Sequence, residues 1–346
     1  MQKISKINWL LSSHKSLSIS RFVYLSLYET ERGYYKKKKV GEDFVTSPQI
    51  SQMFGECIAV FFSMIEKNSF KKSNFLELGP GNGLLLKDLI RSVYQIKKEK
   101  INYYFLEKSN LLKKSFLENL KTKAKIIELK KFNLEQKPHY FICNEFLDAL
   151  PVNQFEKKNN KFYEKRITMK NKTLKIINKK LDFFSNEFIN LKNGDVLEVS
   201  PLSNLYLNKI FNHINNYGGG IIIFDYGPFL KKKIDTLQGI REKKKCDFLK
   251  YPYETDITYH IDFQDIKQKS SNFGLKAYGP ITQKKFLFFN GINERFISLS
   301  KKCTSNLQIK KLESQFNRLT NPEGMGGLIK CIYITKNQLD LGYFNE

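Results

Sequence analysis

The stretch that most constrains this chain is a short apolar segment that leads into a loop with glycine at every second position. Residues 75–78 read Phe-Leu-Glu-Leu and are followed by Gly79, Gly81 and Gly83, and a helical pattern of apolar residues begins at Leu84. Glycines let the backbone take positive φ and approach a ligand closely, and a helix N-terminus offers free N–H groups. The stretch therefore predicts a strand, a loop and a helix that bind a nucleotide-type cofactor.

The acidic residue just before this loop, Glu77, bears on which cofactor binds. A carboxylate there would repel a pyrophosphate, whereas it would attract the sulfonium and ammonium groups of S-adenosylmethionine (SAM). Glu107 ends the next predicted strand, where an acidic side chain can hydrogen-bond ribose hydroxyls. The pattern favours SAM over NAD, although a ligand-free glycine turn and a solvated glutamate share the same short motifs.

Strand and helix patterns alternate from residue 74 onward, which predicts an α/β core with a parallel sheet covered on both faces. The ligand of such a sheet binds outside the carboxyl ends of the strands. The predicted strands are 75–78, 102–106, 124–129, 139–143, 221–224, 275–278 and 328–334, and the predicted core helices are 84–95, 111–121, 201–215, 263–271, 283–300 and 305–318.

Three regions depart from this alternation. Residues 1–73 contain two segments with helical spacing, 18–29 and 49–66, and are predicted to form a helical extension on a 74–346 core. Residues 152–200 alternate apolar and polar side chains between asparagine-rich turns, which predicts an inserted antiparallel hairpin region. A second insertion, residues 228–262, has few apolar residues and many charges and is predicted to be irregular.

Polar residues gather at the predicted ends of two core strands. Asn144, Glu145 and Asp148 follow the 139–143 strand, and Asp225 follows the 221–224 strand. Because these ends share an edge with the glycine loop, the carboxylates could orient a cationic acceptor or take a proton from it. The alternative is an Asn-Glu pair that caps a helix. Methyltransferases acting on DNA bases carry proline where Glu145 stands, which disfavours base methylation.

His260 lies in a second polar cluster after the charged insertion, and it is either catalytic or part of a structural polar network. The other histidines, His14, His139 and His213, are interpreted as structural. The sequence contains none of the histidine spacings typical of zinc enzymes, so no metal site is predicted.

The composition restricts the compartment and the partners. Five scattered cysteines without a C-x-x-C motif indicate a reducing compartment. No apolar run approaches the roughly 18–20 residues that span a bilayer. The net charge of +25 comes mainly from lysines spread along the chain. This charge would suit nucleic acid or an acidic protein partner, but its spread favours a compositional bias on solvated faces.

These motifs, in this order, resemble the family of SAM-dependent methyltransferases that includes the MidA-like proteins and the mitochondrial complex I assembly-factor arginine methyltransferase. The residues that carry the resemblance are Gly33-Tyr34-Tyr35, Asp43-Phe44-Val45-Thr46-Ser47-Pro48, Met53-Phe54-Gly55-Glu56, Glu77 to Gly83, Asn144 to Pro151, Asp225-Tyr226-Gly227, Asp235-Thr236-Leu237-Gln238, Asp256-Ile257-Thr258, His260-Ile261-Asp262-Phe263, Gly279-Pro280, Thr282-Gln283 and Met325-Gly326.

The resemblance implies a Rossmann-like, seven-stranded SAM-methyltransferase core with an N-terminal helical extension and inserted segments. It also implies a protein arginine acceptor, which in the mitochondrial members is a respiratory complex I subunit that becomes symmetrically dimethylated. The sequence departs from the family pattern at Gln49, Lys243, Tyr253 and Gly327. The first two of these bear on the choice of acceptor.

The hypothesis that follows is a SAM-dependent protein arginine methyltransferase. Its predicted catalytic residues are Glu145, Asp148, Asp225 and His260, and its predicted cofactor-binding residues are Glu77, Gly79, Gly81, Gly83, Glu107 and Asn144. The alternatives are a nucleic-acid methyltransferase of the same fold and a non-catalytic SAM-binding assembly factor. Only about seventeen residues precede the first helix of the family pattern, so we expect a bacterial cytoplasm rather than a mitochondrion.

Overall fold

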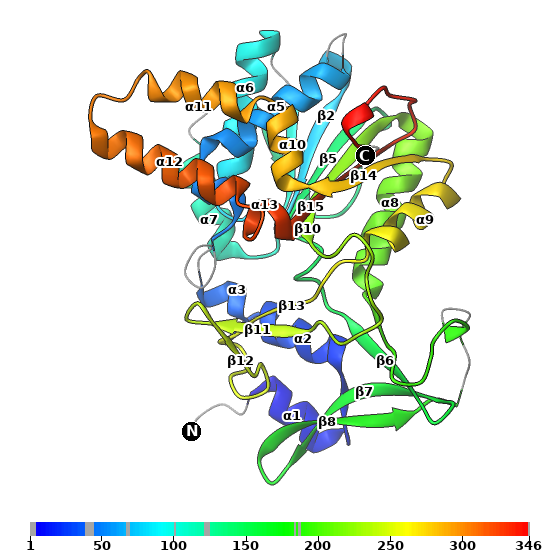
Figure 1. The fold of residues 1–346 in the computed structure, drawn as a ribbon. Helices are drawn as coiled ribbons and strands as arrows, with labels where there is room; N and C mark the ends of the chain where they lie inside the picture. The colour runs from blue at the N-terminus through cyan, green and yellow to red at the C-terminus, as the bar shows by residue number, and fades with distance from the viewer. Residues whose placement is uncertain are drawn as a thin grey trace. The chain divides into compact units, whose positions relative to one another are not determined.

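The computed structural model describes residues 5–38, 45–66, 70–99, 102–120, 125–182, 185 and 188–344 (Figure 1). The chain forms two compact units. The larger unit comprises Lys39–Leu147, Asn208–Leu230 and Ile261–Glu346, and the smaller unit comprises Met1–Lys38, Asp148–Leu207 and Lys231–His260. Asp43 and Phe44, which belong to the sequence resemblance, lie outside the described residues.

The larger unit is built on a seven-stranded sheet with the strand order β14-β15-β10-β5-β2-β3-β4. The first five of these strands in the chain pair in parallel, while β15 is antiparallel to both β10 and β14. All seven predicted strands are present. They are β2 (Asn74–Leu78), β3 (Asn102–Leu106), β4 (Ile126–Glu128), β5 (His139–Asn144), β10 (Gly219–Tyr226), β14 (Lys276–Thr282) and β15 (Ile329–Thr335).

Helices cover both faces of this sheet, which explains why β2 and β15 are buried along their whole length. In Figure 1, α5, α6 and α10 lie on one side of the sheet, and α9 lies on the other. The helices assigned to the larger unit are α4 (Ser47–Ile50), α5 (Gln52–Ile65), α6 (Leu84–Lys97), α7 (Asn110–Asn119), α9 (Phe263–Asn272), α10 (Gln283–Phe289), α11 (Ile292–Ser300), α12 (Asn306–Thr320) and α13 (Met325–Leu328). The boundary between the two units falls within α8 (Pro201–Tyr217).

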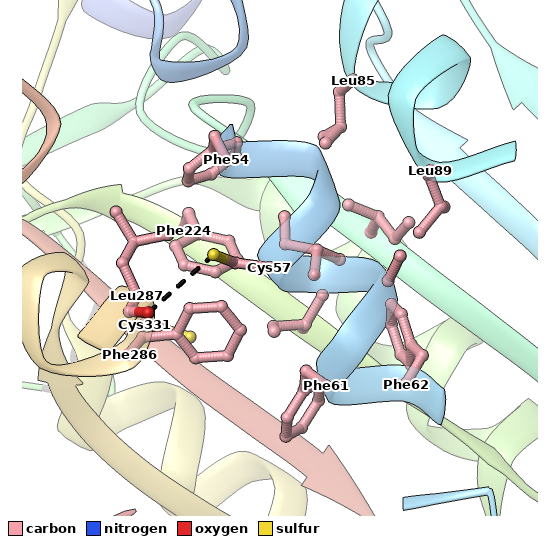
Figure 2. Close-up of a cluster of buried hydrophobic side chains, with 14 of the residues drawn as sticks. Phe54, Cys57, Phe61, Phe62, Leu85, Leu89, Phe224, Phe286, Leu287 and Cys331 are labelled. Carbon is pink, nitrogen blue, oxygen red and sulfur yellow. Dashed lines mark hydrogen bonds between the residues drawn. The ribbon is translucent and has the colours of Figure 1, made fainter. Parts of the chain in front are cut away.

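The core of the larger unit is centred on α5, whose aromatic side chains point into the sheet (Figure 2). The ring of Phe54 lies 5.0 Å from that of Phe224 on β10, and the ring of Phe62 lies 5.2 Å from that of Phe75 on β2. Both contacts have the edge-to-face geometry that aromatic pairs prefer. Helix α5 is therefore held by two of the strands whose carboxyl ends carry predicted site residues.

Two of the predicted helices are interrupted. The segment 49–66 is divided by Ser51, whose extended backbone (φ −159°) separates α4 from α5. The segment 283–300 is divided by Gly291, whose φ of +84° lies in the left-handed region and separates α10 from α11. Apolar periodicity continues through both interruptions, so the sequence pattern does not indicate them.

In its described residues, the smaller unit contains two antiparallel sheets, the start of α8, and the helices α1 (Lys6–Ser13), α2 (Ile19–Tyr28) and α3 (Tyr34–Lys37). The first insertion supplies the predicted hairpins, and the N-terminal segment adds β1 to their edge. The second insertion forms a three-stranded sheet, which its charged composition does not predict. The strands are β1 (Leu17–Ser18), β6 (Asn153–Lys158), β7 (Lys161–Lys170), β8 (Thr173–Lys180), β9 (Val196–Val199), β11 (Gln238–Arg241), β12 (Lys244–Cys246) and β13 (Asp256–Thr258).

Buried side chains hold the smaller unit together across long distances in the sequence. Phe22 of α2 is fully buried and lies 6.1 Å, ring to ring, from Phe248 of the second insertion. Tyr253 accepts a hydrogen bond from the backbone N–H of Ile7 at 3.1 Å. Within the described residues, no helix of either unit has the length and apolar character needed to cross a membrane.

Candidate functional site

The glycine loop lies between β2 and α6 as the sequence predicts. Gly79, Gly81 and Gly83 have φ angles of +64°, +56° and +77°, which L-amino acids with side chains rarely adopt. A Cβ atom on Gly79 would come within 2.6 Å of the Phe146 ring, and a Cβ on Gly83 within 2.6 Å of the Phe116 ring. The loop is therefore shaped both by backbone conformation and by two aromatic rings packed directly against it.

Glu77, two residues before the loop, is buried with one atom unsatisfied. Its side chain is 3% exposed, and its Oε2 atom has no hydrogen-bond partner. Burial, and to a lesser degree the neighbouring Glu107, raises the pKa of the Glu77 carboxyl to about 8. A buried carboxyl group without a partner is costly, and a cationic or hydroxyl group of a ligand would satisfy it.

Glu107 follows β3 and helps to shape the loop. Its Oε1 atom accepts a hydrogen bond from the backbone N–H of Ser109 at 2.8 Å. Burial raises the pKa of its carboxyl, and hydrogen bonds from the backbone of Ser109, Lys108 and Gly81 oppose that rise. The bond from Gly81 joins the acidic end of β3 to the middle glycine of the loop.

Asn144 and Glu145 stand at the carboxyl end of β5, the strand that pairs with β2. The Oδ1 atom of Asn144 is buried and has no hydrogen-bond partner, and its Nδ2 donates to Glu145 Oε1 at 3.3 Å. The same oxygen of Glu145 accepts from the backbone N–H of Ser47 at 3.2 Å. These two donors hold the Glu145 carboxylate at the end of the strand.

The backbone of Glu145 is strained, with a φ of +48° in a residue that has a side chain. A non-glycine residue in this region costs of order 1–3 kcal/mol and persists only where its surroundings hold it there. The backbone N–H of Glu145 donates to the carbonyl of Phe224 on β10 at 2.8 Å. Neighbouring strands therefore hold the turn that presents Glu145.

Asp225 on β10 is hydrogen-bonded to the turn that contains Glu145. It is fully buried, and its Oδ2 accepts the backbone N–H of Leu147 at 2.9 Å, while its Oδ1 accepts the backbone N–H of Tyr226 at 2.9 Å. Both carboxylate oxygens thus bind backbone donors. This geometry suits a residue that positions Glu145 and its neighbours.

The remaining two predicted catalytic residues, Asp148 and His260, lie in the smaller unit. Asp148 is 5% exposed, and its backbone carbonyl accepts the N–H of Tyr259 at 3.2 Å. The backbone N–H of His260 donates to Thr236 Oγ1 at 2.9 Å. The carbonyl of His260 accepts from Lys231 Nζ at 2.5 Å. The four residues are thus divided: Glu145 and Asp225 come together in the larger unit, and Asp148 and His260 in the smaller.

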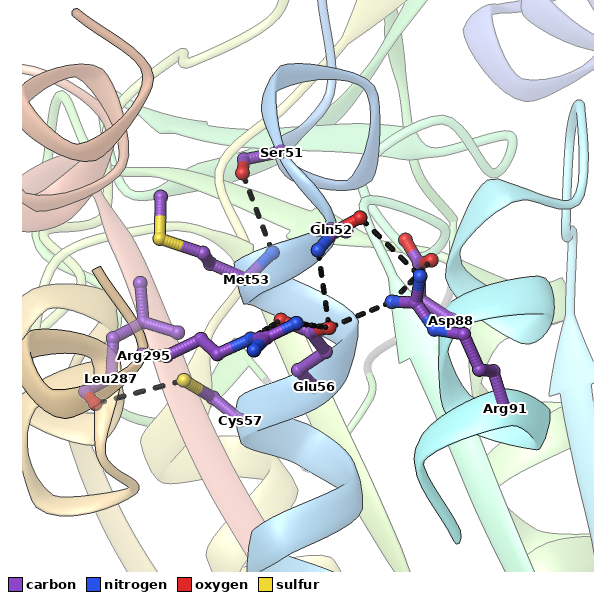
Figure 3. Close-up of polar contacts among 9 residues, drawn as sticks. All are labelled: Ser51, Gln52, Met53, Glu56, Cys57, Asp88, Arg91, Leu287 and Arg295. Carbon is purple, nitrogen blue, oxygen red and sulfur yellow. Dashed lines mark hydrogen bonds and ion pairs between the residues drawn. The ribbon is translucent and has the colours of Figure 1, made fainter. Parts of the chain in front are cut away.

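An ion cluster around a buried glutamate anchors the helix that follows the loop. Figure 3 shows Glu56 of α5 between Arg91 of α6 and Arg295 of α11. Glu56 is 7% exposed, and its carboxylate lies 2.7 Å from Arg91 Nη2 and 2.7 Å from Arg295 Nε. Gln52 completes the cluster by donating to Glu56 Oε1 at 3.3 Å. The cluster fixes α6, and therefore the end of the glycine loop, against α5.

Sequence reasoning gives no role to several of these neighbours. Phe146 and Ser47 lie inside motifs singled out in the sequence, but nothing there links Phe146 to Gly79 or Ser47 to Glu145. Arg91 and Arg295 carry no signal that separates them from other basic residues. The described residues contain no group of three or more His, Cys, Asp or Glu side chains placed to hold a metal ion.

The sheet topology, the glycine loop and the unsatisfied acidic and amide oxygens define an α/β protein. The carboxyl ends of its parallel strands suit a SAM-type cofactor. Residues 53–281 match the family described as "Putative S-adenosyl-L-methionine-dependent methyltransferase", and the chain belongs to this family. The protein is a SAM-dependent methyltransferase.

Known proteins resemble the chain over nearly its whole length. The protein arginine methyltransferase NDUFAF7, mitochondrial, of Xenopus tropicalis is 29% identical over 94% of this chain and 84% of its own. The human protein of the same name is 27% identical over 91% of this chain and 79% of its own. The crystal structure of a Burkholderia thailandensis protein bound to S-adenosyl-homocysteine has the same fold, with a TM-score of 0.84, 21% identity, and coverage of 97% of this chain and 92% of that one.

Proposed function

We propose that the protein transfers a methyl group from SAM to a guanidino nitrogen of an arginine side chain in a protein substrate. The observation that carries this proposal is the Glu145 carboxylate, held by Ser47 and Asn144 at the end of the strand beside the glycine loop. The curated relatives are named as protein arginine methyltransferases, which supports the same acceptor.

The residues around the loop fit the cofactor. The unsatisfied Oε2 of Glu77 and Oδ1 of Asn144 are acceptors available to ammonium or hydroxyl groups. Gly79, Gly81 and Gly83, whose φ angles are positive, leave the backbone at the end of β2 without side chains. Glu107, whose Oε1 already accepts the N–H of Ser109, is proposed to hold the ribose hydroxyls. When bound, SAM supplies an activated methyl group on a positively charged sulfur.

The acceptor needs help from the protein because a guanidinium is protonated at neutral pH and is a poor nucleophile. In the proposed reaction the acceptor nitrogen would bond to the methyl group that SAM supplies, and the electron pair of the broken sulfur–methyl bond would stay on the sulfur. The nitrogen loses one proton, which the Glu145 carboxylate receives and passes to water. Asp225 is proposed to position the Glu145 turn, and the catalytic roles of Asp148 and His260 stay predictions from the sequence.

A Glu145→Gln variant tests this role. The amide keeps the shape of the side chain but cannot receive the proton, so methyl transfer should fall by a factor of about 100 or more. Binding of S-adenosylhomocysteine, measured by calorimetry, should change little. The exposed Glu118 on α7 gives a matched control, and Glu118→Gln should keep full transfer. Turnover by Glu145→Gln close to that of the unchanged protein would remove Glu145 from this role.

The net charge of +25 keeps a second candidate open, a nucleic-acid methyltransferase of the same fold. Incubating the protein with tritiated SAM and a cell lysate separates the two. Label in a protein band supports the proposal, and label in RNA or DNA supports the second candidate. Labelling of neither would favour a SAM-binding assembly factor that does not methylate.

The substrate and compartment follow from the same proposal. We propose a respiratory-chain subunit as the protein substrate. The sequence suggests a bacterial cytoplasm, whereas the names of the curated relatives favour a mitochondrial location. Imaging a carboxyl-terminal fluorescent fusion in the native cell decides between these locations. Mass spectrometry of the labelled band identifies the acceptor and its methylation state.

A further inference from the structure

A groove opens in the larger unit between the start of α5 and the helix pair α11 and α12. Its volume is about 340 Å³, and ligand sites are typically about 300–1,000 Å³. Helix α12 packs against both α11 and α4, the short helix that precedes α5 (Figure 1). Leu299 and Leu312 give the groove an apolar part, and Ser51 lines it where α4 ends and α5 begins. The groove is open to solvent, so a segment of another molecule can enter it.

The charged side chains that line the groove are cationic. Lys302, between α11 and α12, and Lys311, on α12, both line it and are exposed. Within the described parts of the chain, no carboxylate lines the groove and neither ammonium group forms an ion pair. Arg295 on α11, by contrast, is paired with Glu56. The groove therefore carries positive charge that the chain itself does not neutralise.

The polar side chains of the groove offer hydrogen-bond donors. Gln308 Oε1 already accepts the backbone N–H of Thr304 at 2.8 Å, which leaves its amide NH₂ group to donate. Ser51 is 6% exposed, and its Oγ accepts the backbone N–H of Met53 at 3.4 Å (Figure 3). The Ser51 hydroxyl proton makes no hydrogen bond to a described residue. Ammonium, amide and hydroxyl donors together suit a carboxylate ligand.

Helix α4 connects the groove to Glu145 within the larger unit. Ser51 follows the last residue of α4, and Ser47, its first residue, donates its backbone N–H to Glu145 Oε1 at 3.2 Å. Four residues of α-helix rise only about 6 Å. An extended peptide covers about 3.3 Å per residue. A few residues of a bound protein segment are therefore long enough to connect the groove with the Glu145 carboxylate.

We propose that this groove binds acidic side chains of the protein substrate that lie a few residues from the methylated arginine. This inference rests on the proposed function, because it assigns the substrate specificity of the same reaction. The positive charge disfavours a second copy of this chain, whose net charge is +25. Single-stranded nucleic acid is disfavoured because the lining includes no aromatic ring on which bases could stack. Lys302 and Lys311 are thereby specificity-determining residues.

The test measures peptide binding and requires no methyl transfer. The full-length protein, saturated with S-adenosylhomocysteine, is titrated with acetyl-Gly-Arg-Gly-Gly-Gly-Glu-Glu-Gly-amide and with the same peptide carrying two glutamines in place of the glutamates. The unchanged protein should bind the acidic peptide more tightly. The double variant Lys302→Gln/Lys311→Gln should bind the acidic peptide about three- to thirty-fold more weakly, because it removes two partly solvated ion pairs. Its affinity for the neutral peptide should not change.

Two further double variants make the result specific. Lys301→Gln/Lys310→Gln removes the same charge from neighbouring exposed positions that do not line the groove, so it should keep the affinity for the acidic peptide. Lys302→Glu/Lys311→Glu should reverse the preference and bind a peptide with two lysines in place of the glutamates more tightly than the acidic one. All variants should keep their affinity for S-adenosylhomocysteine.

A kinetic measurement links the groove to the reaction. With the protein acceptor that is labelled in the lysate, Lys302→Gln/Lys311→Gln should raise KM and leave kcat nearly unchanged, because the two lysines contribute to binding and not to the chemical step.

The outcomes separate this inference from the proposed function. Equal binding of the acidic and neutral peptides by the unchanged protein would overturn the inference, as would equal losses in the groove variant and in Lys301→Gln/Lys310→Gln. Binding of an RNA octamer of uridylate that depends on Lys302 and Lys311, without binding of the acidic peptide, would also overturn it. The proposed function fails instead if tritiated SAM labels no protein. Labelled protein with an unchanged KM in the groove variant removes only the inference.

Discussion

Residues with a positive φ angle are of different types in the two units. In the larger unit they fall mainly on glycines, and at Gly79 and Gly83 an added Cβ would strike an aromatic ring. In the smaller unit they fall mainly on residues with side chains, in pairs such as Asn159-Asn160 and Glu242-Lys243 at the tips of hairpins. The larger unit needs glycine because its loop has no space for a side chain. The smaller unit needs only a chain reversal, which solvent-exposed side chains allow.

Ion pairs differ in burial within each unit. In the larger unit, the buried Glu56 lies between two arginines. In the smaller unit, Lys231 pairs with Glu198 at 2.8 Å, with side chains 8% and 0% exposed, whereas Arg241 pairs with Glu254, whose side chain is 56% exposed. A buried pair is expensive to break, whereas an exposed pair contributes little because water screens it. The effect of a charge change on stability should therefore follow the burial of the pair rather than the unit that contains it.

The largest expected effect is at the glycine loop. Gly79→Ala should remove measurable binding of S-adenosylhomocysteine, because the φ of +64° resists a side chain and the new Cβ would displace Phe146. Gly194 in the smaller unit is a matched control, since its φ is +91° but no atom lies within 4 Å of an added Cβ. Gly194→Ala should keep full affinity in calorimetry. Equal affinities for the two variants would show that the loop shape is not required.

The next largest effect is on folding stability. Glu56→Ala should lower the free energy of unfolding by about 1.5–3 kcal/mol, because both arginines lose charged hydrogen bonds to a buried carboxylate. The loss stays below that of a fully buried pair because the arginine side chains are 38% and 30% exposed and Arg91 keeps Asp88. Glu254→Ala should lower it by less than about 1 kcal/mol. Urea unfolding monitored by circular dichroism measures both. A loss at Glu56 as small as that at Glu254 would mean that the cluster is solvated in solution.

Glu77 should make cofactor binding depend on pH. In the unliganded protein its pKa is raised to about 8, so the carboxyl is mostly protonated below that pH. A cationic ligand favours the ionised form, so binding releases a proton at pH below 8. SAM affinity should therefore rise with pH by up to about tenfold per unit and become constant above pH 8. Glu77→Gln should bind more weakly and show no such rise in calorimetry.

The Glu77 carboxyl also makes the stability of the unliganded protein depend on pH, in the opposite direction to SAM affinity. Between its ordinary pKa and about 8, the folded protein retains a proton on Glu77 that the unfolded chain releases. Stability of the unliganded protein should therefore fall as pH rises through this interval. Glu77→Gln should remove that part of the pH dependence in urea unfolding. An unchanged pH dependence in this variant would contradict the raised pKa.

The smallest expected effect is at a hairpin tip. Asn160→Gly should raise the free energy of unfolding by a few tenths to about 1 kcal/mol, because glycine adopts the φ of +56° without strain. Thermal unfolding detects the change as a small rise in Tm. The Asn160 side chain accepts a hydrogen bond from Asn193 Nδ2 at 3.1 Å. A fall in Tm would mean that this hydrogen bond stabilises the protein by more than the backbone strain at Asn160 destabilises it.

The larger unit could be predicted from sequence because its signals are local. The glycine loop and the seven strands lie in short windows with clear apolar patterns, and all are present. The reversed direction of β15 depends on how distant segments connect, so no local pattern reveals it. The hydrogen bond between Ser47 and Glu145 joins residues 98 positions apart, and the sequence alone gives no sign of that contact.

Tyr253 shows how a departure from a family pattern can be understood once its backbone is known. The family resemblance implies glycine at this position, and Tyr253 has a φ of +71°. A tyrosine in this conformation is strained. Its ring is buried, and its hydroxyl accepts the N–H of Ile7, a contact that glycine could not make. Packing with the N-terminal segment therefore offsets the strain.

The smaller unit is built from three separate stretches of the chain, so it can fold completely only after the last stretch has been synthesised. Tyr35 bonds Asp256, which follows it by 221 residues, and Ile7 bonds Tyr253 from still earlier in the chain. At a translation rate of about 5–20 residues per second, α2 and α3 leave the ribosome roughly ten to forty seconds before their last partners exist. During that interval the apolar side of α2, with Phe22 and Val23, has no finished core to enter. The nascent N-terminus therefore keeps this apolar side without its final partners until the second insertion has been synthesised.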